Sequence, residues 1–73
     1  MKKVTKDMTL REIFAVEPFL ETTLARRGLD AFNGAVSYDD TLEKVMLDDH
    51  YVQEDIDNMV AGLNMILETM SED

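Results

Sequence analysis

Apolar residues recur at intervals of three and four between residues 53 and 70 of this chain. They are Ile56, Met59, Val60, Leu63, Ile66, Leu67 and Met70. This spacing is typical of one face of an α-helix, and the early Glu54, Asp55 and Asp57 suit the amino end of the helix dipole. We therefore predict a long amphipathic C-terminal helix over residues 53–70. Gly62 is its one weak point: it either lowers helix stability by about 1 kcal/mol relative to alanine or allows another helix to pack closely.

Start and stop signals mark two shorter helices in the first half of the chain. Thr9 and Glu12 have the spacing of a capping box, so the first helix is expected to begin at Leu10. Pro18 lacks an amide proton and ends that helix, yet it suits the first turn of a second helix over residues 18–27. The positions expected to share one side of this second helix are Phe19, Leu20, Thr23 and Leu24.

Two further signals place a helix end and a helix start. Gly28 follows the second helix, and we expect it to take the left-handed conformation that closes a helix, with Leu29 as the apolar residue after it. Thr41 offers a cap to a short third helix, which is expected to end near Asp49 or His50. The sequence therefore predicts helices on both sides of a central connection.

That connection, residues 30–41, is the least regular part of the chain, and its Asn33-Gly34 pair favours a turn. A two-strand hairpin would need longer flanks, so a loop, with or without one helical turn, is the favoured interpretation. Together the signals predict an all-α fold. It is one domain over residues 1–73, a compact bundle of four or five short helices with a longer C-terminal amphipathic helix.

Length and composition narrow the class of protein. The 73 residues contain no cysteine, so one small core must hold the fold without disulfides, and self-association would supplement it. Sixteen Asp and Glu against seven Lys and Arg give a net charge of −9, which disfavours nucleic acid and anionic membranes as partners. No apolar run approaches a membrane span and no apolar signal segment is recognised, so a cytoplasmic location is expected.

The charge of this small acidic protein is unevenly distributed. Residues 1–28 carry six basic and four acidic groups, a net charge of +2, whereas residues 29–73 carry one basic and twelve acidic groups, a net charge of −11. This asymmetry can steer a basic partner or orient head-to-tail self-association. A solvated acidic surface that keeps a small protein in solution explains the same pattern.

The order of these signals resembles a known family. It consists of residues 4–10, Pro18, residues 27–29 and residues 41–44, followed by the terminal amphipathic helix. In this order the chain resembles the family called domain of unknown function 1858, small helical domains related to the hybrid-cluster-protein-associated disulfide domains. It is also similar to the amino-terminal domain of the iron–sulfur cluster repair proteins. The resemblance implies a compact all-helical domain.

Redox-active members of that family carry a Cys-x-x-Cys pair just after the glycine that ends the second helix. Counted from Gly28, the two positions are Ala31 and Gly34, and neither is a cysteine. Thiol–disulfide exchange needs two thiols, one with a lowered pKa and one that resolves the mixed disulfide. The chain therefore looks like a cysteine-free member that keeps the scaffold and a surface loop without that chemistry.

Acidic residues around the only histidine form a candidate metal site. Asp48, Asp49 and His50, with Glu54 and Asp55 nearby in sequence, offer oxygen and nitrogen ligands for a divalent ion. The other interpretation is structural: His50 takes the glycine-like position that ends the third helix, and the carboxylates are solvated. No catalytic residue, no resident metal ligand and no cofactor is assigned from the sequence.

An interaction surface is the remaining hypothesis. Phe32 lies beside Asn33 and Gly34 in a polar, turn-forming stretch, where an aromatic side chain is either tucked into the core or offered to a partner. Of the six methionines, most are expected in the core and Met65 is the best exposed candidate. We predict a non-enzymatic protein-interaction or regulatory module that binds a protein partner or forms a homodimer. The competing hypothesis is a divalent-metal or small-ligand sensor that uses His50 and nearby carboxylates.

Overall fold

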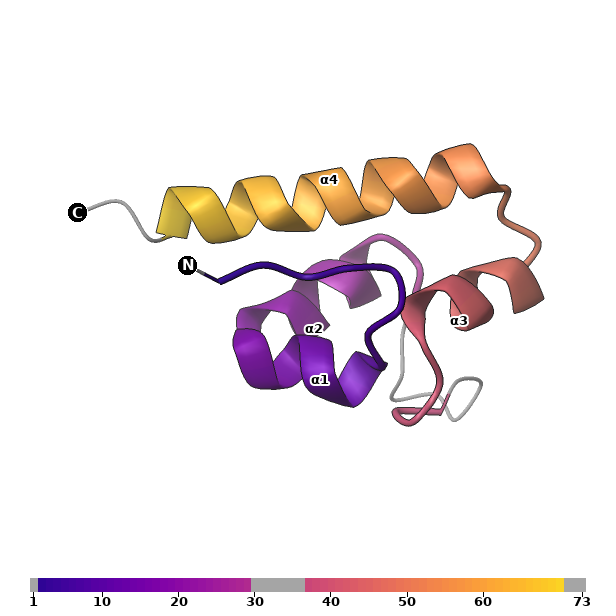
Figure 1. The fold of residues 1–73 in the computed structure, drawn as a ribbon, viewed down its shortest axis with the longest axis horizontal. Coiled ribbons are helices and arrows are strands. Elements are labelled where there is room, and N and C mark those ends of the chain that lie inside the picture. Colours follow the sequence, from indigo (N-terminus) through magenta and orange to yellow (C-terminus); the bar gives the residue numbers. More distant parts are fainter. Residues whose placement is uncertain (1, 30–36, 71–73) are drawn as a thin grey trace.

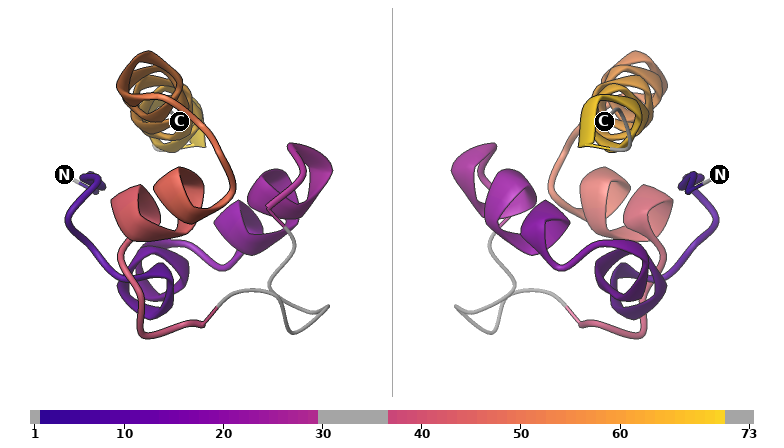
Figure 2. Two further views of the ribbon diagram at one scale, coloured as in Figure 1. Left: turned by 90° about the vertical axis from the view of Figure 1, so that its right-hand side faces the viewer. Right: turned by 90° about the vertical axis from the view of Figure 1, so that its left-hand side faces the viewer.

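A computed structural model describes residues 2–29 and 37–70, and within them the chain folds into four α-helices. They are α1 (Leu10–Val16), α2 (Phe19–Arg26), α3 (Leu42–Asp48) and α4 (Gln53–Met70). Figure 1 shows α4 running along one side of the molecule, and Figure 2 shows it end-on above the three short helices. The predicted all-α fold is confirmed, and α4 has the bounds expected from its apolar spacing.

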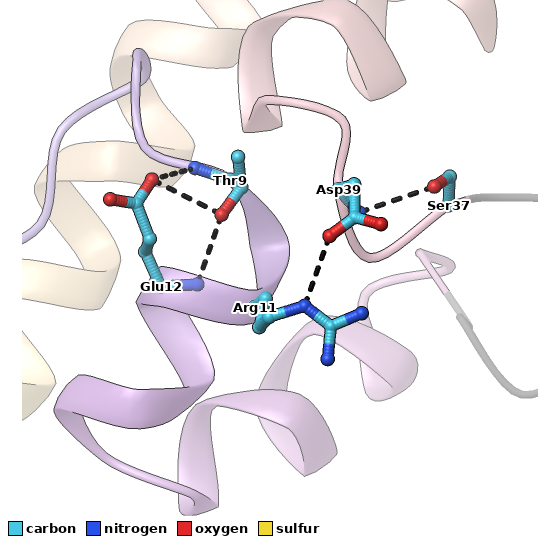
Figure 3. Close-up of polar contacts among 5 residues, drawn as sticks. All are labelled: Thr9, Arg11, Glu12, Ser37 and Asp39. Atoms are coloured by element: carbon cyan, nitrogen blue, oxygen red, sulfur yellow. Dashed lines mark hydrogen bonds and ion pairs between the residues drawn. The ribbon is translucent and has the colours of Figure 1, made fainter.

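The start of α1 follows the predicted capping box. The Oγ1 atom of Thr9 accepts a hydrogen bond from the amide of Glu12 at 3.1 Å, and the Glu12 carboxylate accepts one from the amide of Thr9 at 2.8 Å (Figure 3). Pro18 has helical backbone angles, φ −57° and ψ −27°, and directly precedes α2. The predicted boundaries of these two helices therefore hold to within one residue.

The end of α2 is the left-handed closure expected at Gly28, whose φ is +97°. The amide of Leu29 donates to the carbonyl of Leu24 at 2.9 Å, and the amide of Gly28 donates to the carbonyl of Ala25 at 3.1 Å. This is the Schellman arrangement, and the buried side chains of Leu24 and Leu29 belong to the same core cluster. The sequence therefore predicted this helix end correctly.

The first turns of α1 and α3 form one shared structure. Residues 6–12 and 38–44 lie antiparallel and are bridged at Thr9 and Thr41. The first two amides of each helix donate to carbonyls of the other segment, so the residues before each helix cap the other helix. These four hydrogen bonds, 2.9–3.1 Å long, run from Leu10 to Asp40, from Arg11 to Tyr38, from Leu42 to Met8 and from Glu43 to Lys6.

The third amide of each helix is bound by its own cap. The amide of Lys44 donates to the Oγ1 atom of Thr41 at 3.1 Å, as the amide of Glu12 does to Thr9. The amides at the start of a helix have no partner within the helix. The pairing of the two segments and the two threonine caps together satisfy the first three amides of both α1 and α3. Residues 9–14 and 41–46 share the pattern Thr-Leu-x-x-Ile/Val-Phe/Met, a short internal repeat that the sequence analysis did not recognise.

The core lies between α4 and the three short helices. Its fully buried large side chains come from every helix and from the N-terminal segment, and they are Val4, Leu10, Ile13, Leu20, Leu24, Leu42, Met46, Ile56 and Leu63. Within the described residues, no helix combines the length and apolar character needed to cross a membrane.

Two residues assigned to apolar faces from the sequence are exposed. Phe19 is 46% exposed because it is the first residue of α2, next to the exposed Pro18. Met70 is 49% exposed because it is the last residue of α4, whose C-terminal turn extends past α1 and α2 (Figure 1). The other positions of each predicted face are buried or partly buried, so the exposed ones are confined to helix ends.

Candidate interaction surface

An extended N-terminal segment lies along α4 and is held there by one side chain. The Oδ1 atom of Asn64 accepts a hydrogen bond from the amide of Val4 at 2.8 Å, and its Nδ2 atom donates to the carbonyl of Val4 at 3.0 Å. The side-chain amide group of Asn64 thus pairs with both the N–H and the C=O group of Val4, as the backbone of a neighbouring strand would. The segment runs beside α4 (Figure 1), and because the Val4 side chain is fully buried, packing as well as hydrogen bonds holds it.

An open groove of about 380 Å³ lies between this segment and α4. Residues 3–7 form one wall, and Asp57, Val60, Ala61 and Asn64 of α4 form the other. Polar and charged residues contribute to both walls, but the surface that the lining exposes is mainly apolar. A concave, largely apolar surface with a few polar groups has the character of a binding site.

Met65 extends this apolar surface along α4. It is 67% exposed, more than any other large apolar side chain in the described part of the chain. It follows Ala61 by four residues, so the two side chains are neighbours on one helix face. The exposure expected for Met65 from the sequence is confirmed. The groove residues were not predicted as part of a site.

An ion pair fixes the charge at one edge of the groove. The Nζ atom of Lys6 lies 3.0 Å from the carboxylate of Glu43. The hydrogen bond to Glu43, followed by the charge of that carboxylate and smaller contributions from Asp7 and Asp57, raises the pKa of Lys6 above 10.5. A raised lysine pKa means that the attraction is present below the unfolded pKa and is lost only as the pH rises through the folded one. The charge of Lys6 is therefore constant across the neutral range.

The predicted loop contacts cannot be placed beside this groove. Phe32, Asn33 and Gly34 lie outside the described residues, as does Ala31, the other position aligned with a family cysteine. Of the four residues predicted to bind a partner, Met65 alone has a described position.

The described chain resumes at residue 37 and is anchored at once by Tyr38. The Tyr38 ring meets the Phe14 ring edge-on, with centroids 5.7 Å apart, and the guanidinium carbon of Arg11 lies 5.8 Å from the Tyr38 centroid. The Tyr38 hydroxyl also donates a hydrogen bond to the carboxylate of Glu21. This side chain therefore ties the start of the segment to both α1 and α2.

Residues 37–41 form a turn rather than the strand of a hairpin. The amide of Asp40 donates to the carbonyl of Ser37 at 3.2 Å, and the amide of Asp39 donates to the Ser37 hydroxyl at 3.2 Å. The Asp39 carboxylate accepts a hydrogen bond from the Nε atom of Arg11 at 3.0 Å (Figure 3). In this described part, the loop interpretation is the correct one.

The histidine of the candidate metal site ends a helix. His50 is exposed and has a φ of +70°, and its amide donates to the carbonyl of Leu47 at 3.1 Å. The amide of Tyr51 donates to the carbonyl of Met46 at 3.0 Å, which completes the same closure that Gly28 makes after α2. The glycine-like position considered for His50 is confirmed. Across residues 2–29 and 37–70, no three histidine, aspartate or glutamate side chains are grouped so that they could hold a metal ion.

The left-handed backbone conformation of His50 is strained for a residue with a side chain. A residue with a Cβ atom costs about 1–2 kcal/mol in the left-handed region, whereas glycine enters it freely but loses more chain entropy on folding. We expect His50→Gly to raise the free energy of unfolding by about 0.5–1 kcal/mol, measured by urea denaturation. Asp49→Gly is the matched control, because the φ of Asp49 is −95° and glycine relieves no strain there. A His50→Gly protein no more stable than wild type would contradict this account.

Gly62 does admit a close neighbour, but the neighbour is a side chain rather than a helix. The guanidinium of Arg27, just after α2, lies 3.4–3.7 Å from the place where a Cβ atom of residue 62 would stand. Arg27 therefore covers this turn of α4.

Comparison of the chain with protein-family models, with curated proteins and with solved structures finds no match. The resemblance to domain of unknown function 1858 accordingly stays a prediction from the order of sequence signals.

Proposed function

We propose that this chain is a non-enzymatic, cytoplasmic protein-interaction or regulatory domain and a cysteine-free relative of the domain of unknown function 1858 family. The observation that carries the proposal is the apolar surface that runs from the groove beside Val4 across Ala61 to Met65. Exposed apolar side chains that continue a groove are typical of surfaces that bind other proteins. The partner is another protein or a second copy of the chain.

The rigid construction of this surface supports the same function. One wall belongs to α4, the longest helix, and the other is fixed by both hydrogen bonds of Asn64 and by burial of Val4. A preformed surface binds with a smaller loss of conformational entropy than one that must be ordered on binding.

Removal of the Met65 side chain tests the proposal. We expect Met65→Ser to weaken association by about tenfold, because truncating a central apolar contact commonly costs more than about 1 kcal/mol of binding free energy. Association is measured in two ways: sedimentation over a concentration series for self-association, and affinity capture from extract of the source cells for a different partner. Leu47→Ser is the control, because it truncates another large apolar side chain that is half exposed, on α3. Both variants should keep the thermal stability of wild type.

The control decides the outcome. Retention of a partner by wild type and Leu47→Ser, with loss by Met65→Ser, supports the surface. A wild type that stays monomeric at every concentration, and that captures no protein lost by Met65→Ser, contradicts the proposed function.

A further inference from the structure

The outward face of α4 carries five exposed residues at intervals of four and three. They are Glu54, Asn58, Ala61, Met65 and Glu68, and together they are called the α4 stripe. This spacing places them on one side of the helix, away from the buried side chains Ile56, Met59, Leu63 and Leu67. The stripe therefore has an apolar centre with a carboxylate toward each end, and Ala61 joins it to the groove. Over residues 54–68 it extends about 21 Å, about four helical turns.

Charge determines what can cover this stripe. The helix α4 contains four carboxylates and no lysine, arginine or histidine. Lys3 and Lys6 lie on the opposite wall of the groove, and the Nζ atom of Lys6 is engaged with Glu43 at 3.0 Å. The single lysine of residues 37–70, Lys44, is engaged with Asp48 at 2.7 Å and with Asp40 at 3.8 Å. Within residues 2–29 and 37–70, the Glu54 carboxylate has no hydrogen-bond or ion-pair partner. The α4 stripe is therefore an apolar patch on a helix whose charged side chains are all acidic.

This charge disfavours a symmetric dimer in which two copies of α4 face each other. In a symmetric dimer the same surface lies on both sides of the interface, so α4 would face α4. Such packing brings the carboxylates of two α4 helices together without a cation on either helix, and like charges across an interface are unfavourable. A partner with its own cations removes this penalty and gains attraction instead.

We infer that the α4 stripe binds a basic amphipathic helix of another protein. An apolar side chain of that helix packs beside Ala61 and Met65, and its lysine or arginine side chains face Glu54 and Asp57. A helix of about 14 residues matches the length of the stripe. The inference rests on the proposed interaction function and adds the chemistry of the partner.

Three synthetic peptides of one length test the inference. Each places leucine at helical intervals of three and four, and the remaining positions carry lysine in the first peptide, glutamine in the second and glutamate in the third. In NMR titrations of the full ¹⁵N-labelled chain, we expect the lysine peptide to shift amides of residues 54–68 and to bind about tenfold more tightly than the glutamine peptide. Binding of the lysine peptide should weaken as salt is raised, and the glutamate peptide should not bind.

Matched variants separate the stripe from the general acidity of the chain. Met65→Ser and Glu54→Gln should each weaken the lysine peptide several-fold. Asp49→Asn removes the same charge from an exposed residue outside the stripe, and it should leave the affinity within about twofold.

Several results would overturn the inference. Equal affinity for the lysine and glutamine peptides at the stripe would show that the partner need not be basic, and it would leave the proposed interaction function intact. Shifts centred elsewhere, equal weakening by Asp49→Asn, or no binding of the lysine peptide would remove the stripe as the site of such a helix. A wild-type dimer that Met65→Ser dissociates would show that a second copy is the occupant. The proposed function fails separately, if wild type neither self-associates nor captures a protein that Met65→Ser loses.

Discussion

Asn64→Ala is expected to lower the free energy of unfolding by about 2–3 kcal/mol, although it removes only an amide group from a half-buried position. Both backbone groups of Val4 lose their partners, and each unsatisfied polar group in a partly buried site costs about 1–1.5 kcal/mol. The Val4 side chain, fully buried in wild type, then loses the contacts that keep it in the core. Urea denaturation measures the loss, and hydrogen exchange at the Val4 amide reports its place.

Two variants make this prediction specific. Asn58→Ala changes the same residue type at an exposed position of α4 and should leave stability within about 0.5 kcal/mol. Asn64→Asp keeps the acceptor for the Val4 amide but sets a carboxylate oxygen against the Val4 carbonyl, so it should be destabilised as well. If Asn64→Ala unfolds at the wild-type urea concentration and the Val4 amide stays protected, the segment is held by its side-chain packing alone.

The same substitution connects stability to the candidate surface. Residues 3–7 form one wall of the groove, and Asn64 is the side chain that holds this wall against α4. Loss of that contact should therefore open the groove while α4 itself remains helical. A stability effect and a binding effect from one polar side chain would show that the N-terminal segment belongs to the surface.

Helix boundaries were predictable because they are decided locally. The capping box of Thr9 and Glu12, the cap of Thr41 and the left-handed Gly28 all depend on amides and carbonyls within a few residues. The apolar spacing of α4 was equally informative, since the long helix buries one face along most of its length. His50 fits the same rule, as the residue that ends α3 in the place of a glycine.

Long-range contacts were not predictable in this way. Asn64 binds Val4 sixty residues away, and Arg27 covers Gly62, although neither polar residue carries a local signal for its partner. The groove depends on the first of these contacts, so the sequence could indicate Met65 as exposed but not the concave surface beside it. The contact between the starts of α1 and α3 did have a signal in the sequence, namely the Thr-Leu pattern that occurs at Thr9 and again at Thr41.

That repeated pattern leads to the second large effect, at the shared start of α1 and α3. Thr9→Ala and Thr41→Ala each remove a helix cap, and each should lower the free energy of unfolding by about 1 kcal/mol. The double variant should lose about 1.5 kcal/mol, which is about 0.5 kcal/mol less than the sum of the two single losses. The reason is that the first two amides of each helix use carbonyls of the other segment, so a first substitution already loosens the site of the second.

A double-mutant cycle by urea denaturation measures this coupling, with wild type, both single variants and the double variant compared under one condition. Thr22→Ala is the control, because Thr22 is exposed inside α2 and alanine there should be neutral or slightly stabilising. Strict additivity of the two caps would mean that α1 and α3 begin independently. A coupling of about 0.5 kcal/mol or more would show that the antiparallel pair of segments 6–12 and 38–44 acts as one unit, which joins the two halves of the chain.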